Sequence, residues 1–308
     1  MYQSLSLTSF IETWLNTFKS TAVKQSTYDR LITSLKALEG FTIASKAIGE
    51  ITAVDIQNYV NDLTQCGYGL STIKKQMRIV TAPLKQAAAL HWIPANPAVG
   101  ITLPAKSNVK KESQAVEAYS PDEQKALAAV LDSRGRRGFA AVALMIETGL
   151  RVGEALALRW CDVQLPRRRL TVRATVVRLA NKKQSFVQQD AKSVSSNRVV
   201  PLTPAAVALL EGLRIDNDSE WVFTDEQGER LSYEALRYQT KVACAAAGVE
   251  YRGMHVFRHT FATNCYYKGM DVKILSRLLG HADVNITYNI YVHLYGDGFE
   301  EMYSALVK

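Results

Sequence analysis

Apolar side chains in the first hundred residues recur at intervals of three and four, which is the spacing of an amphipathic helix that buries one face. Four runs have this spacing. Three of them begin near a Ser or Thr that has an acidic residue three positions later, the pattern of an N-terminal capping box. The pairs are Ser9 with Glu12, Ser26 with Asp29, and Thr52 with Asp55. The spacing predicts a helical domain over residues 1–105.

The fourth helical run has a basic outer face. It covers residues 71–90, and we expect a kink or a break at Pro83, whose nitrogen has no hydrogen to donate. Residues 1–110 contain eleven Lys and Arg against six Asp and Glu, which favours a phosphate-binding face over a merely solvated one. The basic residues that we expect to contact phosphate here are Lys74, Lys75 and Arg78.

The apolar period stops over residues 96–118, where two prolines and several lysines gather. This composition is typical of an extended linker that lies along a phosphate backbone, and Lys110 and Lys111 are its expected contacts. The domain boundary belongs here. We predict a helical domain over residues 1–105, a basic linker over 106–118 and a second domain over 119–308.

The pattern of the second domain changes from helices to strands after Arg169. Strand-forming residues occupy three short segments on either side of a polar turn rich in Ser and Asn. The segments are 170–177, 186–187 and 199–202. Helices precede and follow them, beginning at capping signals such as Ser120 and Ser232. The second domain should therefore combine many helices with a few short strands.

One stretch near the end of the chain concentrates residues that can handle a phosphate. His255 and Arg258 are three positions apart, so they lie on one face of a helix. His281 follows Gly280, a residue typical of helix ends, and Tyr291 lies ten positions beyond that histidine. Arg binds phosphate oxygens with two donors, His transfers protons and Tyr can be a nucleophile. The set predicts a phosphodiester substrate.

A zinc site is the competing interpretation, because His255 and His259 have the i,i+4 spacing of a helical metal pair. The residues between them supply no Glu that could serve as a general base, and Arg258 puts a cation beside the supposed metal. We therefore expect no metal ion here. His259 is then a core histidine.

These motifs resemble the signature boxes of the tyrosine recombinases, the family of phage and conjugative-transposon integrases. His-x-x-Arg-His-Thr-Phe-Ala-Thr, then Leu-Leu-Gly-His and Tyr-x-His, is similar to the second box, and Thr-Gly-Leu-Arg-x-Gly-Glu over residues 148–154 is similar to the first. The resemblance implies a mainly α fold with a small antiparallel β-sheet. It also implies two domains, a helical core-binding domain that grips DNA and a mixed α/β catalytic domain.

The resemblance also assigns roles to individual residues. It implies catalytic functions for Arg151, Lys192, His255, Arg258, His281 and Tyr291, with Glu154 in support. Lys192 precedes the strand at 199–202 in a hairpin, where Lys182 and Lys183 are the rivals for the same role. Tyr288 and Tyr295 lie close to Tyr291, but only Tyr291 has the Asn-Ile-Tyr-x-His context of the family's nucleophile.

The implied activity is site-specific recombination of double-stranded DNA through a 3′-phosphotyrosyl intermediate and a Holliday junction, without a metal or small-molecule cofactor. The family works as a homo-tetramer on DNA, and its C-terminal helix, here residues 297–308, docks on a neighbouring protomer. We expect integration or excision of a mobile element. The alternatives are a Xer-like resolvase of chromosome or plasmid dimers and a non-catalytic DNA-binding relative, against which the complete residue set argues.

Composition agrees with such a partner. The net charge is +8 and the sequence pI is near 9.2, which permits DNA binding without demanding it. No apolar run approaches the length of a membrane span, and no basic region precedes an apolar stretch at the start. We expect a cytoplasmic protein that does not enter the membrane.

Overall fold

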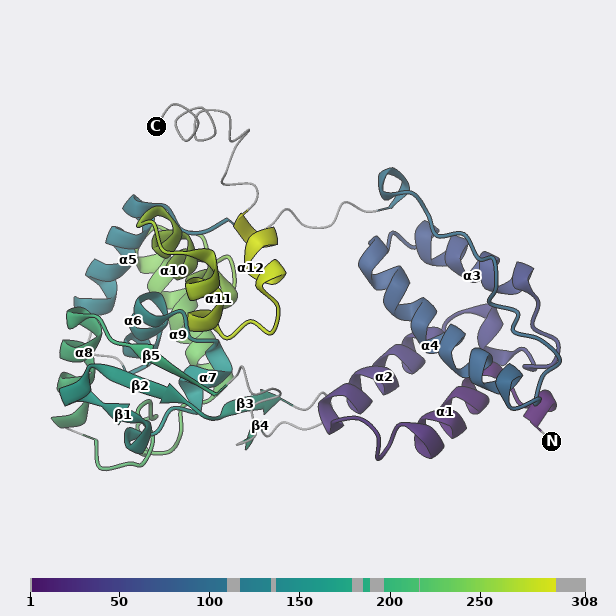
Figure 1. Cartoon of the computed structure of the whole chain (residues 1–308), viewed down its shortest axis with the longest axis horizontal. Helices are drawn as coiled ribbons and strands as arrows, with labels where there is room; N and C mark the ends of the chain where they lie inside the picture. Colours follow the sequence, from purple (N-terminus) through teal and green to yellow (C-terminus); the bar gives the residue numbers. More distant parts are fainter. Residues whose placement is uncertain are drawn as a thin grey trace. The chain divides into compact units, whose positions relative to one another are not determined.

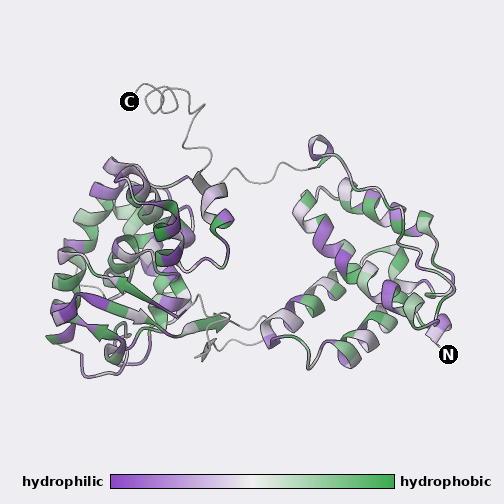
Figure 2. Cartoon of the chain, in the orientation of Figure 1, coloured by the Kyte–Doolittle hydropathy of each residue, from purple (hydrophilic) through white to green (hydrophobic). Residues whose placement is uncertain are grey.

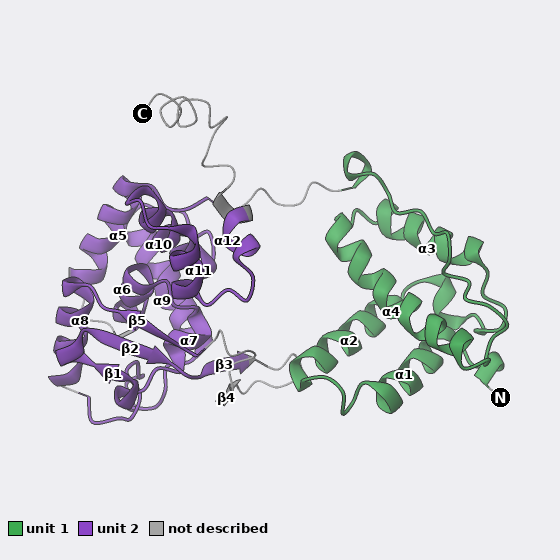
Figure 3. Cartoon of the chain, in the orientation of Figure 1, with its two compact units in different colours: residues 1–115, 178–184 green, residues 116–177, 185–308 purple. Residues whose placement is uncertain are grey.

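The computed structural model describes residues 2–109, 117–133, 137–178, 185–188, 197–215 and 217–291 (Figure 1). The chain divides into two compact units, one of residues 1–115 with 178–184 and the other of residues 116–177 with 185–308 (Figure 3). The predicted linker contacts Lys110 and Lys111 lie outside the described residues, as do Lys182, Lys183, Lys192 and the tail 297–308.

The first unit is helical. Its α-helices are α1 (Leu7–Phe18), α2 (Gln25–Leu38), α3 (Ala53–Gln65) and α4 (Leu70–Ala89), and short 3-10 turns lie at Tyr2–Ser4, Thr42–Ser45 and Lys106–Asn108. The apolar stripes of the four helices meet in one core, which includes Phe10, Leu15, Ile56, Tyr59 and Val80. Figure 2 shows hydrophobic and hydrophilic residues interspersed along these helices.

One of the three predicted capping boxes in this unit is present and two are wrong. Thr52 caps α3, and its side chain and that of Asp55 each accept the other's backbone N–H. Helix α1 begins at Leu7, two residues before the predicted cap Ser9, because the Leu7 side chain is fully buried and packs in the core as part of the first turn. Ser6 is its cap. Helix α2 begins at Gln25, after a Lys that makes no side-chain cap, so the Ser26 pair also lies inside a helix.

Helix α4 runs through Pro83 without a break, so the predicted break is wrong. The ring of Pro83 is buried in the core beside Leu84, and this burial offsets the missing backbone hydrogen bond. On the opposite side of the helix the basic residues are exposed to solvent. They are Lys74, Lys75, Arg78 and Lys85.

In the second unit, helices pack around one central helix, α6 (Arg137–Thr148). The unit also contains α5 (Pro121–Ser133), α7 (Val152–Leu156), α8 (Pro204–Ile215), α9 (Tyr233–Ala246), α10 (His255–Tyr267), α11 (Val272–Leu279) and α12 (Val284–Tyr291). Helix α6 packs against α8, α9 and α10. Its fully buried side chains, Phe139, Ala141, Val142, Leu144 and Met145, explain why the sequence of this helix is apolar almost all round.

The strands form two small sheets beside these helices. They are β1 (Val163–Gln164), β2 (Arg169–Val172), β3 (Thr175–Arg178), β4 (Ser185–Gln188) and β5 (Arg198–Pro201). The first sheet has the order β1-β2-β5 and is antiparallel, and β3 pairs with β4 in the second. The mainly α fold with a small antiparallel sheet is confirmed.

The register of β5 decides which of its side chains face inward. Leu170 pairs with Val200, and Val172 pairs with Arg198. Side chains alternate along a strand, so Arg198 and Val200 share the buried face while Val199 is exposed. A charged side chain therefore enters the interior of the second unit.

None of the described helices combines the length and the apolar character needed to cross a bilayer.

Candidate active site

Glu154 holds Arg151 by two contacts at the start of α7. Its carboxylate accepts the backbone N–H of Arg151 at 2.9 Å and the Nη1 donor of the same residue at 2.7 Å. A carboxylate at the third position of a helix commonly binds the N–H before the first turn. Here the same carboxylate also fixes the guanidinium, so the i,i+3 spacing of the two residues sets the position of the cation.

Two glycines in the same motif allow close packing. Gly149 has a positive φ of 65°, and a Cβ atom there would collide with the ring of Phe261. A Cβ on Gly153 would lie 2.5 Å from Thr175 Oγ1 and 2.7 Å from the Val176 carbonyl oxygen. Helix α7 therefore lies directly against β3, and the Thr-Gly-Leu-Arg-x-Gly-Glu pattern has a steric reason at both glycines.

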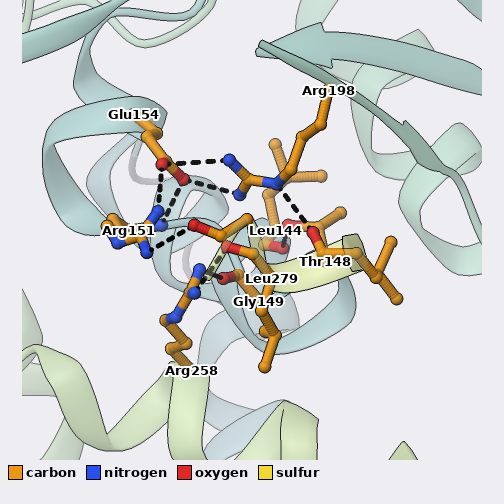
Figure 4. Close-up of polar contacts among 10 residues, drawn as sticks. Leu144, Thr148, Gly149, Arg151, Glu154, Arg198, Arg258 and Leu279 are labelled. Atoms are coloured by element: carbon orange, nitrogen blue, oxygen red, sulfur yellow. Dashed lines mark hydrogen bonds and ion pairs between the residues drawn. The ribbon is translucent and has the colours of Figure 1, made fainter. Parts of the chain in front are cut away.

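Three arginines from different elements meet at the C-terminal end of α11 (Figure 4). Arg198 Nε donates to the carbonyl of Leu278 at 2.7 Å, Arg258 Nη2 to that of Leu279 at 2.5 Å, and Arg151 Nη2 to that of Gly280 at 3.1 Å. The last carbonyls of a helix have no partner within it, and this end of the helix dipole attracts cations. Arg258 also donates through Nη1 to Gly149 at 2.9 Å. The helix end thus gathers the cations.

Glu154 is the anion of this cluster. It is buried, and Arg198 donates to both of its oxygens at 3.0 and 2.8 Å. Burial by itself would raise the pKa of Glu154, but the hydrogen bonds and charge of Arg198, together with the charge of Arg151, lower it to about 2. The carboxylate is therefore ionised at neutral pH. Three guanidinium groups and one carboxylate leave two positive charges in excess.

Two imidazoles border the arginines. His281 lies just after α11, and its Nδ1 shares a hydrogen bond of 2.8 Å with Thr287 Oγ1 on α12. Loss of hydration, followed by the positive charges of Arg258 and Arg151, lowers the pKa of His281 to about 4. The same causes, in the same order, lower the pKa of His255. Both rings are therefore neutral at pH 7 and can accept or share a proton.

The lowered pKa makes unfolding dependent on pH. An unfolded His281 binds a proton near pH 6.5 and the folded one only near 4, so stability falls as pH falls through this interval. We expect wild type to lose up to about 3 kcal/mol more than His281→Asn between pH 7 and 4. Urea unfolding at several pH values measures this. Equal losses in wild type and His281→Asn would contradict the prediction.

A model of the phage integrase family matches residues 118–297, more than half of the chain and the whole of this site. The chain belongs to the phage integrase family. This family member is 29% identical to the XerC-like tyrosine recombinase of Caldanaerobacter subterraneus subsp. tengcongensis, over 95% of the chain and 80% of that protein.

This family member has the same fold as solved structures of other integrases, although the sequence identity is low. The integrase of transposon Tn1549 in complex with transposon right end DNA has a TM-score of 0.81 and 17% identity, covering 99% of this chain and 100% of that one. A lambda integrase tetramer bound to a Holliday junction has a TM-score of 0.69 and 19% identity, covering 93% and 77%. The two-unit architecture is therefore that of known integrases.

The structure brings most of the predicted site residues of this integrase-family chain together. Arg151, Glu154, Arg258 and His281 are joined through α11 and its neighbours, and the charges of Arg151 and Arg258 act on His255. Tyr291 is the last residue of α12, and its side chain is not among those described. Among the described residues, no three His, Cys, Asp or Glu side chains are grouped as metal ligands would be.

Arg198 is the member of the cluster that the sequence motifs did not single out. Its signal was present but indirect. The strand at residues 198–201 alternates, and Arg198 falls on the same side as Val200. A charged residue on the buried side of a strand needs a partner, since an unpaired buried charge is costly. That partner is Glu154.

Proposed function

We propose that this member of the phage integrase family is a tyrosine-type site-specific recombinase that cuts and rejoins double-stranded DNA. The observation that supports this best is the excess of two positive charges, held by Arg151, Arg258 and Arg198 around one buried carboxylate, beside two neutral histidines. A phosphodiester gains negative charge as it becomes pentacoordinate, and preorganised donors favour that state. The site offers such donors on side chains.

The proposed reaction exchanges one phosphoester for another. The Oη atom of Tyr291 bonds to phosphorus while the bond from phosphorus to the 5′-oxygen breaks, leaving a 3′-phosphotyrosyl link. Arg151 and Arg258 bind the non-bridging oxygens, with a donor from His281. His255 assists proton transfer, and Lys192 protonates the departing 5′-oxygen. A free 5′-hydroxyl on a partner strand then reverses the step, and two exchanges pass through a Holliday junction.

The assembly and the biological setting are part of the proposal. The lambda integrase relative is a tetramer on a Holliday junction, and we propose a homo-tetramer here, with the tail 297–308 docking on a neighbouring protomer. The transposon integrase relative supports integration or excision of a mobile element. The XerC-like relative, which matches 95% of the chain, supports dimer resolution as the second candidate. We propose the cytoplasm as the location, because the DNA substrate lies there.

Trapping of covalent complexes tests the proposed chemistry. Genomic fragments of the host are nicked at random, incubated with the protein, denatured and separated, so that only DNA bonded to protein is recovered. A nick beside the cleavage point lets the short leaving strand diffuse away and traps the phosphotyrosyl link. We expect one sequence to be enriched among the recovered fragments. Recovery of no denaturant-resistant complex would refute the proposal.

The exposed face of α4 provides a second test of DNA binding. Each phosphate contact that is lost should reduce the slope of log affinity against log salt by about one unit. The Lys74→Ala/Lys75→Ala/Arg78→Ala protein should therefore lose about three units of slope. A protein with Lys125, Arg214 and Lys241 changed to Ala loses the same charge from α5, α8 and α9 and is the control. If both triple variants lose equal slope, the α4 face has no special role.

A further inference from the structure

Arg198 is bound to the carboxylate of Glu154 and to the end of α11, yet the proposed reaction gives it no role. We propose that Arg198 is a positioning residue that neutralises Glu154, so that the positive charges of Arg151 and Arg258 remain available to the scissile phosphate. The inference rests on the proposed function, because it concerns the same phosphate.

The contacts of Arg198 are all internal. Its Nε, Nη1 and Nη2 atoms each donate to a protein oxygen, one on Leu278 and two on Glu154, and its side chain is 6% exposed. The side chain of Arg151 is 33% exposed by comparison. Arg258 is as buried as Arg198, at 8% for each residue, so burial alone does not distinguish them. The difference lies in the partners, because Arg258 donates to two backbone carbonyls while Arg198 donates through both Nη atoms to the carboxylate of Glu154. The effect of Arg198 on the phosphate is therefore exerted through Glu154.

The charges explain why such a residue is needed. Glu154 lies 2.7 Å from Arg151, so a carboxylate without a second partner would cancel the charge of the arginine that binds phosphate. Arg198 binds the same carboxylate at 2.8 Å. With Arg198 in place, Glu154 still orients Arg151 through two hydrogen bonds, yet its negative charge is matched by a separate cation. Orientation and charge are thus provided by different residues.

A purely mechanical role is the competing explanation, because Arg198 also ties β5 to the end of α11 through the Leu278 carbonyl. The two explanations differ in their dependence on Glu154. Charge neutralisation has no purpose once residue 154 is uncharged. A mechanical tie to Leu278 is needed whether residue 154 is charged or not.

A double-mutant cycle separates these explanations. Wild type, Arg198→Met, Glu154→Gln and the double variant are compared in single-turnover formation of the covalent complex on the recovered DNA site. We expect Arg198→Met to slow the reaction at least about tenfold when Glu154 is present and less than about threefold when residue 154 is Gln. Arg169→Met is the control, since Arg169 lies on the same sheet but donates to Gln164. Equal losses in both backgrounds would overturn the inference.

A second readout does not depend on catalysis. Inorganic phosphate is titrated into each DNA-free protein and followed by NMR shifts. Arg198→Met should bind phosphate several-fold more weakly than wild type, and the double variant should recover the affinity of Glu154→Gln. If wild type traps no DNA, the proposed recombinase chemistry fails, whereas unchanged phosphate affinity in Arg198→Met refutes the role of Arg198 alone.

The folding of Arg198→Met is checked by thermal melting, because removing one partner leaves Glu154 buried beside a single cation. If this variant does not fold, the double variant decides. It buries no unpaired carboxylate, and we expect it to fold and to react within about threefold of Glu154→Gln. A double variant that unfolds or is inactive would favour the mechanical tie and overturn the inference.

Discussion

We expect Tyr291→Phe to form no covalent complex with its DNA site, while its affinity for that site stays within about twofold of wild type, since one hydroxyl contributes little to ground-state binding. The phenylalanine ring keeps the shape of the side chain and has no oxygen that can bond to phosphorus. A denaturing gel of the nicked duplex measures the complex, and a filter or mobility assay measures affinity.

Tyr288→Phe is the matched control for this experiment. Tyr288 lies on α12 three positions before Tyr291, so it is on the same side of the helix, and its side chain is 47% exposed. The control should form the complex at the wild-type rate. A denaturant-resistant band in Tyr291→Phe would contradict the assignment, and peptide mapping of that band would identify the true nucleophile.

Arg258→Lys should slow covalent complex formation by two orders of magnitude or more, about the loss seen when one preorganised donor to a developing charge is removed. The guanidinium of Arg258 holds two carbonyls, on Gly149 and Leu279, while pointing its charge into the site. A lysine has the charge but lacks the planar arrangement of donors, so it cannot satisfy both carbonyls and bind a phosphate oxygen as well.

Arg277→Lys provides the comparison, because Arg277 belongs to α11 and is exposed to solvent. It should react as wild type does. Single-turnover rates at saturating protein, with melting temperatures for each variant, separate a chemical effect from unfolding. Arg258→Lys that folds and cleaves at the wild-type rate would show that the bidentate geometry is not needed.

Local sequence patterns predicted the presence of the helices better than they predicted the residues at which the helices begin. The Thr52 box was correct because its helix begins in an exposed turn, where the cap is the strongest local signal. The Ser9 box failed because burial of Leu7 extends α1 towards the N-terminus. At Pro83 the packing of the ring in the core outweighed the missing donor. In each failure a tertiary contact overrode a preference of the backbone.

The site shows the same limit. Arg151 and Glu154 are three residues apart, so one helical turn brings them together and the motif reveals the pair. Arg198 is 44 residues from Glu154 in sequence, and only the register between β2 and β5 turns its side chain inward. The alternation of that strand can be recognised in a single sequence, but the identity of the residue that pairs with Arg198 cannot. Ion pairs between distant segments therefore have to be read from the structure.

The convergence on α11 also affects when the protein can become active during its synthesis. The three contacts at the end of this helix span 21, 80 and 129 residues of sequence, so none forms before nearly the whole second unit has been made. A nascent chain that lacks α11 can still pair Arg151 and Arg198 with Glu154, but it has neither the three carbonyls at the end of α11 nor His281 and Tyr291. A ribosome-bound fragment should thus be unable to cleave DNA. Cleavage should begin only when the second unit has been completed and has folded.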